Sequence, residues 1–354
     1  MWLKVNDSRF KNLRVMHERF IFPVGQGGFA GERIGNTVVV YDCGSLSSTS
    51  MVEDCIDHAS EHVDHVDLLF ISHFDNDHVN GLRYLLSQVQ VKRAVVAWIK
   101  PELRAAYGVY TNGAYNAVMG LLRGDDVSVD EIGSEEREEG TYDVKDIWEW
   151  IARSMMTVAE FNNVIARMQN AGIDVPRLTK DPYYLENQKE NINTAFKDEF
   201  GAKGPNTKGL IMLSQRCVKV VEKSNSLFKG CWCIDGYRRY IRPRLVNELA
   251  ETSCLYVGDA DLKNKTNNSL VKDFLKRHLK EDILLLMQIP HHGSQYNIGA
   301  QFETDFAAHY YFVNDVDTKR LQKSPGLFKS LTGQKKLLVS RGIYQNLIGT
   351  RTVI

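Results

Sequence analysis

Short runs of apolar residues alternate with polar and glycine-rich segments along much of the chain. Apolar runs of four to six residues that stop at polar residues are typical of buried strands. Such runs predict strands at 68–71, 94–99, 210–213, 218–221, 254–257, 283–289, 310–313 and 336–339. Helical spacing predicts helices near 50–62, 79–87, 114–122, 144–154, 159–169 and 269–279. Strands interleaved with helices predict an α/β fold.

The first part of the chain predicts paired strands around a glycine-rich turn. Residues 13–44 hold two apolar stretches on either side of Val24-Gly25-Gln26-Gly27-Gly28-Phe29. So many glycines are unsuited to the interior of an element and indicate a turn. The β-branched run from Thr37 to Tyr41 then ends at Asp42-Cys43-Gly44-Ser45.

Residues 101–203 differ from the rest, because they carry helical patterns and an acidic run at 124–139. The motifs described below stop before this stretch and resume after it. We therefore expect a single domain over 1–354 with a mostly helical insertion at 101–203. The acidic run is expected to be a solvated loop, and the insertion is the expected docking site for a protein partner.

Composition sets limits on location and partners. The chain has 354 residues, 43% of them hydrophobic, with 44 Lys and Arg against 44 Asp and Glu. A net charge of zero argues against a strongly basic nucleic-acid coat but allows a local basic groove. The six cysteines show no paired CxxC spacing, which indicates free thiols in a reducing compartment. There is no apolar leader and no run of the ~18 apolar residues that a membrane span needs, so a cytoplasmic protein without membrane contact is expected.

Three polar segments follow predicted strands. They are 72–78 (SHFDNDH), 257–259 (VGD) and 290–294 (PHHGS). Each lies at the C-terminal end of an apolar run, so the three are expected to meet at one edge of the fold. Histidines and carboxylates that converge in this way are typical metal ligands.

The spacing of these residues predicts two ions. His73 and Asp75 are two residues apart and face the same way in an extended segment. Asp77 and His78 then lie at the start of the next helix, aimed at a neighbouring point. Asp259 comes from a second strand end, where its carboxylate could bridge two ions. Two ions ~3.5–4 Å apart can clamp a phosphoryl group and lower the pKa of a bridging water.

Taken in order, the motifs resemble the metallo-β-lactamase superfamily, a four-layer αββα sandwich with a dinuclear site. Within it, the chain most resembles the hydrolase (nuclease) domain of the ComEC-type competence proteins. The matching segments are 24–27, 42–44, 72–81, 206–210, 258–259 and 290–294. The resemblance covers roughly residues 15–100 and 205–345 and leaves the insertion unexplained.

Three positions depart from the pattern of that family. Gly28 replaces an acidic or small polar residue, Gly209 stands where serine is common, and Asp75 stands where many superfamily members have a second histidine. An oxygen-rich site of this kind suits Mn²⁺ or Mg²⁺ better than a histidine-rich zinc site would.

The resemblance implies two divalent ions, Zn²⁺ or Mn²⁺, and a division of roles. The first ion is assigned to His73, Asp75, Asp259 and water. The second ion is assigned to Asp77, His78, Asp259 and one of the paired histidines. Of the pair, His292 is the preferred ligand. His291 is then expected to face the phosphate or to donate a proton. Asp77 and His291 are the expected catalytic residues, and Asp42 is expected to support ligands rather than bind metal.

Four further residues are candidates for substrate contact. Asn206 and Ser294 lie in the motif segments. Arg238 and Arg239 lie in Tyr237-Arg238-Arg239-Tyr240-Ile241-Arg242-Pro243-Arg244, which interleaves cations with aromatic residues. Such a segment is suited to single-stranded nucleic acid, although an ordinary basic loop has the same composition.

The sequence therefore predicts a metal-dependent phosphodiesterase, with DNA as the leading substrate through the resemblance. Relatives that stand alone without membrane segments often occur in bacterial defence loci, which suggests by analogy an antiviral effector. A small phosphodiester, such as a cyclic nucleotide or a phosphocholine ester, is the alternative substrate. A non-catalytic metal-binding sensor or partner subunit is the third hypothesis.

Overall fold

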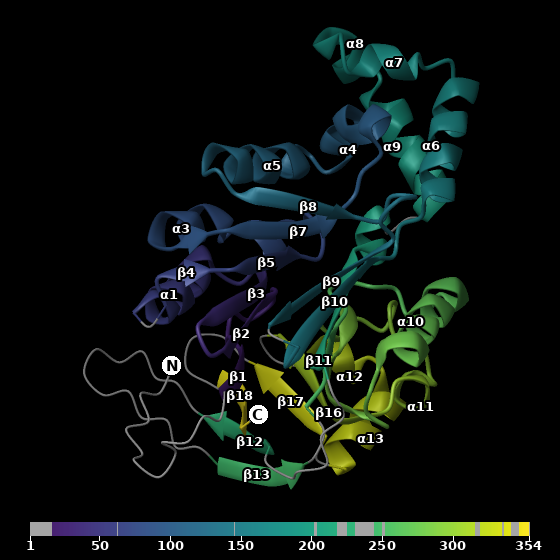
Figure 1. Ribbon diagram of the computed structural model, residues 1–354. Coiled ribbons are helices and arrows are strands. Elements are labelled where there is room, and N and C mark those ends of the chain that lie inside the picture. The colour runs from purple at the N-terminus through teal and green to yellow at the C-terminus, as the bar shows by residue number, and fades with distance from the viewer. Residues whose placement is uncertain are drawn as a thin grey trace.

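The computed structural model describes residues 16–61, 63–144, 146–201, 204–217, 225–230, 244–249, 252–315, 319–334, 336–340 and 347–353. In these parts of the chain two β-sheets pack face to face, and helices cover the outer face of each sheet (Figure 1). The predicted α/β fold, a four-layer αββα sandwich, is confirmed.

The first sheet contains, within the described ranges, nine strands in the order β13-β12-β18-β1-β2-β3-β5-β7-β8. β1, β2 and β3 are antiparallel neighbours, and β3, β5, β7 and β8 run parallel. The bounds are β1 Met16–Ile21, β2 Phe29–Ile34, β3 Thr37–Cys43, β5 Leu68–Ile71, β7 Arg93–Ala97, β8 Ser128–Ile132, β12 Asn225–Gly230, β13 Arg244–Leu249 and β18 Leu347–Val353. A short pair, β4 His65–Val66 and β6 Gln90–Val91, lies apart from both large sheets.

The second sheet contains seven strands of the described chain in the order β17-β16-β15-β14-β11-β10-β9. Its parallel half is β14 to β17, and its antiparallel half is β9 to β11. The bounds are β9 Glu139–Val144, β10 Trp148–Ser154, β11 Leu210–Arg216, β14 Cys254–Tyr256, β15 Leu284–Gln288, β16 Ala308–Asn314 and β17 Leu337–Ser340.

The helices form the two outer layers and a lobe at one end of the molecule (Figure 1). α1 Thr49–Ser60, α2 Asn76–Val79, α3 Leu82–Gln88, α4 Arg104–Tyr110 and α5 Ala114–Gly124 follow strands of the first sheet. α10 Lys265–His278, α11 Phe302–Asp305, α12 Lys319–Gln322 and α13 Pro325–Gly333 accompany the second sheet. The lobe consists of α6 Val158–Asn170, α7 Val175–Leu178, α8 Pro182–Asn187 and α9 Lys189–Phe200. The described residues also contain three 3₁₀ turns: η2 Pro101–Leu103, η3 Pro205–Lys208 and η4 Pro290–Gly293.

The central core lies between the two sheets and is rich in aromatic residues. Tyr41 and Phe70 of the first sheet share one buried cluster with Trp150 and Tyr256 of the second. The rings of Tyr41 and Tyr256 are 4.8 Å apart, centroid to centroid. Contacts of this kind between inner faces are what hold a sandwich together.

The prediction of a helix over 144–154 is wrong, because this segment contains strand β10. Trp148, Trp150 and Ala152 alternate along the strand and are fully buried between the sheets. Ile151 points the other way, into the outer core beneath the second layer of helices. Apolar residues at 144, 147, 148, 151 and 152 also recur at the three-and-four spacing of a helix face, so the pattern favours a helix as well as a strand.

The prediction of a mostly helical insertion at 101–203 is correct only for the two ends of that range. α4 and α5 occupy the first end and the lobe the second, but β8, β9 and β10 between them belong to the two sheets. The acidic run is not entirely a solvated loop, since β8 lies within it. There Asp130 pairs with Arg137, and Glu131 pairs with Arg104. The predicted strand 218–221 lies outside the described residues.

A buried ion pair of the first sheet is hydrogen-bonded to residues of the second sheet. Arg19 Nε on β1 donates to Glu32 Oε1 on β2 at 2.6 Å. From the second sheet, Trp150 Nε1, Ser214 Oγ and Tyr256 Oη donate to the same carboxylate at 2.9, 2.6 and 2.8 Å. Arg19 in turn donates to Ser214 Oγ at 3.1 Å. Glu32 is therefore held from both sheets at once.

The surroundings of Glu32 keep it ionised. Burial raises the pKa of Glu32, but the charge of Arg19 and the hydrogen bonds from His17 and Ser214 outweigh burial and hold that pKa far below its usual range. Burial lowers the pKa of His17 to about 4, so this imidazole is neutral at neutral pH. Arg19 is therefore the cation that balances the Glu32 charge.

Replacing Arg19 with methionine is expected to lower the free energy of unfolding by about 3–5 kcal/mol, because it leaves a buried carboxylate without its cation. Urea denaturation with linear extrapolation measures this change. The matched control is Arg93→Met, whose partner Asp130 lies 3.7 Å away and whose side chain is 47% exposed; its expected loss is below about 1 kcal/mol. Equal losses in the two variants would contradict a structural role for the buried pair.

Candidate metal centre

The candidate site lies where four strands of the two sheets end. Asp42 lies at the end of β3, and the segment with His73 and His78 follows β5. Asp259 follows β14, and His292 lies in the η4 turn after β15. Since β3 and β5 are parallel, as are β14 and β15, the carboxyl ends of both pairs carry these side chains. Ligands in α/β folds bind at this edge.

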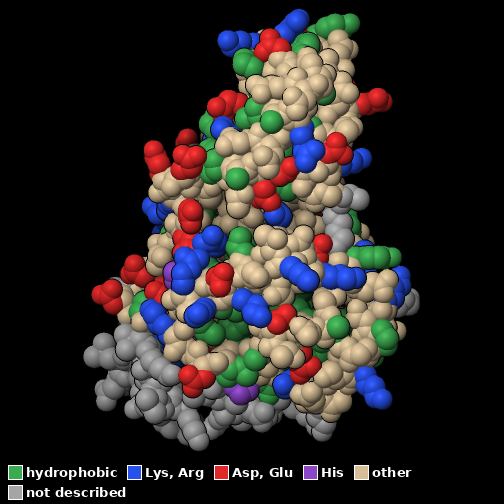
Figure 2. Space-filling view, turned by 90° about the vertical axis from the view of Figure 1, so that its right-hand side faces the viewer, with side chains coloured by type: hydrophobic (Ala, Val, Ile, Leu, Met, Phe, Trp, Pro, Cys, Tyr) green, Lys and Arg blue, Asp and Glu red, His purple; other side chains and the backbone are tan. Residues whose placement is uncertain are grey.

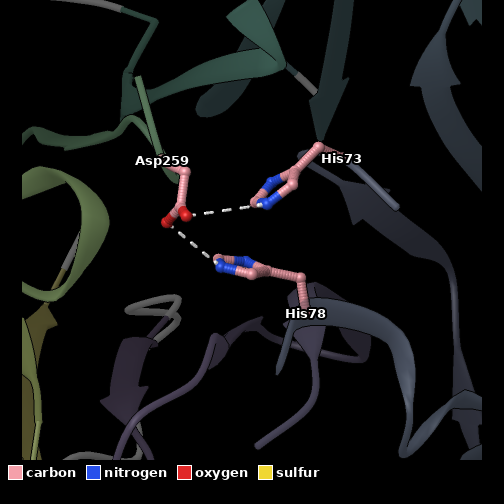
Figure 3. A group of neighbouring side chains, drawn as sticks. All are labelled: His73, His78 and Asp259. Atoms are coloured by element: carbon pink, nitrogen blue, oxygen red, sulfur yellow. Dashed lines mark ion pairs between the residues drawn. The ribbon is translucent and has the colours of Figure 1, made fainter. Parts of the chain in front are cut away.

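The first ligand group consists of His73, His78 and Asp259, all buried (Figure 3). His73 Nε2 lies 3.8 Å from Asp259 Oδ2, and His78 Nε2 lies 3.3 Å from Asp259 Oδ1. The ligand atoms lie within 4.8 Å of one another. One ion of the size of Zn²⁺ or Mn²⁺ can be bound by three such atoms.

The second ligand group consists of Asp77, His78 and His292, also buried. His292 Nε2 lies 3.1 Å from Asp77 Oδ2 and 3.8 Å from Asp259 Oδ1. The Asp259 carboxylate therefore lies between the two groups, as expected for a residue that bridges two ions. His78 belongs to both groups, whereas the sequence assigned it to the second ion alone.

The buried atoms at this site fit a divalent cation. His73 Nε2, His78 Nε2 and Asp259 Oδ1 have no hydrogen-bond partner within the described parts of the chain. Buried polar atoms without partners are costly and rare in folded proteins. Metal ions bound by these nitrogens and this oxygen would satisfy all three atoms at once.

Neighbouring carboxylates and imidazoles in the cluster shift each other's pKa values. Burial lowers the pKa of His78, but Asp42 and Asp259 outweigh it, and the net shift is well above the usual value. Burial raises the pKa of Asp259, but His78 and His73 hold it well below its usual range. The pKa of Asp77 is also lowered, because a hydrogen bond to His292 and the charge of His78 overcome its burial. The carboxylates are thus ionised and ready to bind a cation.

The ring of His78 is oriented by Asp42. Asp42 Oδ2 lies 2.7 Å from His78 Nδ1, and it also accepts from Ser72 Oγ at 2.7 Å. Asp42 Oδ1 accepts from the Ser72 backbone N–H at 2.7 Å. A carboxylate on Nδ1 fixes the tautomer that leaves Nε2 free for metal. Asp42 thus has the supporting position that the sequence suggested for it.

His292 is oriented in the same way by a backbone carbonyl. Its Nδ1 lies 2.9 Å from the Asn314 carbonyl oxygen, so Nδ1–H can donate and Nε2 faces Asp77. His291 and His292 have φ angles of +48° and +51°, in the left-handed region. Two consecutive residues in this conformation are strained, and the turn sends their rings to different places.

His291 lies at the edge of the cluster. Its side chain is 34% exposed, and its Nδ1 lies 3.6 Å from Asp259 Oδ2. Burial lowers the pKa of His291, with Asp259 acting against this effect. The residue thus faces both the bridging carboxylate and the solvent, unlike the buried His292.

Asp75 lies at the mouth of the site and belongs to neither compact group. Its side chain is 43% exposed, and its Oδ2 lies 3.7 Å from His73 Nε2. Asn206 Nδ2 donates to Asp75 Oδ1 at 2.7 Å. The structure therefore brings Asp75 and Asn206 together beside the first ligand group.

Two glycines that depart from the family pattern have a steric reason here. A Cβ atom on Gly28 would lie 2.7 Å from His78 Nδ1 and 2.9 Å from Asp42 Cβ. A Cβ atom on Gly209 would lie 2.2 Å from the Ser72 carbonyl oxygen. Leu210 N donates to that same oxygen at 2.6 Å, so this strand is clamped against the start of the ligand segment.

Of the remaining candidates, Ser294 lies next to the histidine turn, where its Oγ accepts from Tyr296 N at 3.4 Å. Arg238 and Arg239 lie outside the described residues. Sequence reasoning missed Gln288, whose Oε1 accepts from Val257 N and Gly258 N at 2.8 and 2.9 Å and so holds the turn before Asp259. A glutamine at a strand end carries no signal that would have identified it.

Replacing Gly209 with serine is expected to weaken metal binding about 10–100-fold, the range seen when residues that support ligands are changed. The new side chain would displace Ser72 and, with it, His73. A competition titration against a chromophoric chelator measures the affinity. Gly120→Ser is the matched control, since no atom lies within 4 Å of a Cβ built there. If Gly209→Ser binds metal as tightly as the wild-type protein, the close approach of Gly209 to Ser72 does not support the ligand segment.

No helix in the described part of the chain is long and apolar enough to cross a membrane.

Comparison with known proteins gives one family. Residues 32–152 match the family model described as "Metallo-beta-lactamase superfamily". No curated protein matches the chain.

Several solved structures match the chain at low TM-scores. The metallo-beta-lactamase fold protein YhfI from Bacillus subtilis is 8% identical, with 94% of this chain and 100% of that chain covered and a TM-score of 0.42. A diphosphatase from the PhnP family is 8% identical, with 97% and 100% covered and a TM-score of 0.40. The apo chemotaxis sensor ODP from T. denticola is 13% identical, with 35% of this chain covered and a TM-score of 0.25. The chain spans 43% of the length of that sensor. At such TM-scores these similarities carry nothing about activity.

Proposed function

We propose, because residues 32–152 match the model of the metallo-β-lactamase superfamily, that the chain is a metal-dependent phosphodiesterase with two divalent ions, and specifically a nuclease acting on DNA. The observation that carries the proposal is the position of Asp259, which belongs to the first buried ligand group and whose Oδ1 lies 3.8 Å from His292 Nε2 of the second. Paired sites of this kind suit phosphodiester hydrolysis. DNA as the substrate rests on the motif resemblance to the ComEC-type hydrolase domain.

Different side chains of the site would have different roles in such a reaction. Two bound divalent ions would supply an activated water and stabilise the charge that develops on the phosphate. Asp259 would hold both ion positions at a fixed separation, and Asp42 would keep His78 in the correct tautomer. The proposed catalytic residue Asp77 lies 3.1 Å from His292 and would fix the second position.

His291 is proposed to act on the substrate rather than on the metal. It is the partly exposed member of the histidine pair, and a neutral imidazole carries one N–H donor. That donor can bind a non-bridging phosphate oxygen or give its proton to the leaving oxygen. Asn206 and Asp75 would border the opposite side of the entrance.

A role as a bacterial antiviral effector is part of this proposal and is supported by analogy with relatives that lack membrane segments. The lobe of α6 to α9 is the proposed contact for a protein partner, because it extends from one end of the sandwich (Figure 1). The antiviral role requires hydrolytic activity, so the cleavage assay described next tests its premise.

The function is tested by cleavage of labelled single-stranded DNA, duplex DNA and RNA with Mn²⁺, Mg²⁺ or Zn²⁺ supplied in turn. Small phosphodiesters are assayed beside them. We expect metal-dependent cleavage of DNA that is lost in Asp77→Ala. Turnover of small phosphodiesters alone would replace the proposed substrate, and bound metal without any turnover would favour a non-catalytic sensor.

The two histidines of the turn are expected to separate metal binding from chemistry. His291→Ala should keep both ions and lower kcat by about 10²–10⁴-fold, the usual contribution of a proton donor or acceptor. His292→Ala should lose one ion and the activity with it. Metal content per chain and kcat are measured on the same preparations, with His65→Ala, which pairs with Asp64 outside the site, as the control. Loss of metal in His291→Ala would reverse the assignment.

A further inference from the structure

The exposed face of α10 carries a stripe of basic and polar residues. Lys265, Ser269, Lys272 and Lys276 are spaced i, i+4, i+7 and i+11, which places them in a row on one side of a helix. All four are exposed. The opposite side of α10 is buried against the second sheet through residues that include Val271 and Phe274. The row therefore faces solvent along the whole helix.

This face is more basic than the chain as a whole. The protein has equal numbers of acidic and basic residues, 44 of each, yet α10 holds four Lys and Arg residues and one carboxylate, Asp273. Lys272 pairs with Asp305 at 2.9 Å, and Arg277 pairs with Glu139 at 2.7 Å. Lys265 and Lys276 form no ion pair with any described residue, so their charges are available to a ligand.

Two grooves run along this row. One has a volume of about 1000 Å³ and is lined by Arg153, Lys265, Lys276 and Arg277, with Glu138 and Asp273 as its acidic residues. The other has a volume of about 500 Å³ and is lined on the α10 side by Lys263, Lys265 and Lys272, with Asp305 as its acidic residue. Lys265 and Ser269 line both grooves, so the two grooves border each other at these residues. Figure 2 faces this side of the molecule and shows Lys and Arg side chains gathered in a band across its middle.

The second groove is built from the same two loops that carry the metal ligands. The chain runs from Asp259 to Lys263 and into α10, and the loop after His292 forms the facing wall at 299–301. Asn297 ties the two loops together, because its Nδ2 donates to the Asp259 carbonyl at 2.8 Å and its carbonyl accepts from Lys263 N at 3.0 Å. The two walls of this groove thus follow in the chain from the segments that carry Asp259 and His292, and Asn297 joins those segments.

An exposed aromatic residue lies in the chain between the histidine turn and the 299–301 wall of this groove. Tyr296 is 63% exposed and lies four positions after His292. Aromatic side chains next to a basic groove provide a surface on which nucleic-acid bases stack, worth ~1–3 kcal/mol per base.

We propose that the basic row of α10 binds the phosphate backbone of a nucleic acid whose scissile phosphodiester lies at the metal centre. The inference rests on the proposed phosphodiesterase function and names a polymer as its substrate. α10 has 14 residues and is therefore ~21 Å long, long enough for its basic row to contact several successive phosphates of one strand. Tyr296 stacks on a base next to the cleaved bond.

The test compares two variants that each lose three positive charges. The first carries Lys265→Ala, Lys272→Ala and Lys276→Ala, and the control carries Lys180→Ala, Lys189→Ala and Lys197→Ala at exposed positions of the lobe. Both are made in an Asp77→Ala background, so that the DNA is bound without being cut. Fluorescence anisotropy of a labelled DNA oligonucleotide of about 20 nucleotides is measured over a range of salt concentrations. Thermal unfolding confirms that both variants are folded.

The α10 variant is expected to bind roughly tenfold more weakly than its parent at moderate salt. The slope of log affinity against log salt should fall by about 2, since single-stranded nucleic acid loses ~0.7 per phosphate contact removed. The lobe variant should retain the affinity and slope of its parent. Equal affinity in the two variants would overturn the inference.

A separate measurement isolates the proposed function. Turnover of bis(p-nitrophenyl) phosphate by the wild-type protein needs the metal centre and no groove. If this turnover is present while the two charge variants bind DNA equally, the proposed DNA-binding role of α10 is wrong and the proposed phosphodiesterase activity is supported. If the turnover is absent with every metal while DNA binding still depends on the α10 lysines, the proposed phosphodiesterase activity is wrong and the DNA-binding role of α10 is supported.

Discussion

Three buried carboxylates meet three buried histidines at one edge of this fold, and their mutual attraction is the constraint on which the site depends. Asp42, Asp77 and Asp259 are each 6% exposed or less. Carboxylates so far from water require partners of positive charge. Asp259 approaches His73, His78 and His292 between 3.3 and 3.8 Å. Divalent ions bound by these carboxylates and by neutral imidazoles would supply the positive charge.

The position of Asp259 is set by contacts well away from the ligands. It lies three residues after Tyr256, whose hydroxyl donates to Glu32 across the two sheets. The Arg19–Glu32 pair thus anchors β14 against the first sheet, on which the His73 segment begins. Gln288 then fixes the turn from β14 to Asp259. The two halves of the site are carried by different sheets, so the buried network between the sheets also determines the spacing of the ligands.

Much of the site could be predicted from the sequence because its residues come in short segments at the ends of apolar runs. His73, Asp77, His78, Asp259 and His292 were all named from that pattern, and the structure brings them within reach of one another. Asp75 and Asn206 were also named and lie at the mouth of the site. The sequence could not show that His78 contacts both groups, since this depends on the angle at which the α2 turn leaves β5.

The errors came from segments whose tertiary surroundings override local pattern. Around β10 the apolar residues 144, 147, 148, 151 and 152 follow the spacing of a helix face, whereas pairing with β9 and β11 makes the segment a strand. The acidic run contains β8, whose carboxylates are balanced by arginines from other elements. The basic row of α10 went unnoticed because the predicted helix began at residue 269, after Lys265. Its link to the metal centre depends on Asn297, which joins two loops that are distant in sequence.

The central claim is that one carboxylate, Asp259, joins two metal positions. Crystals grown with Mn²⁺ and measured for anomalous scattering test it most directly. The account predicts two peaks about 3.5–4 Å apart, one beside His73 and the other beside His292, with Asp259 in contact with both. A single peak, or two peaks of which only one touches Asp259, would contradict it.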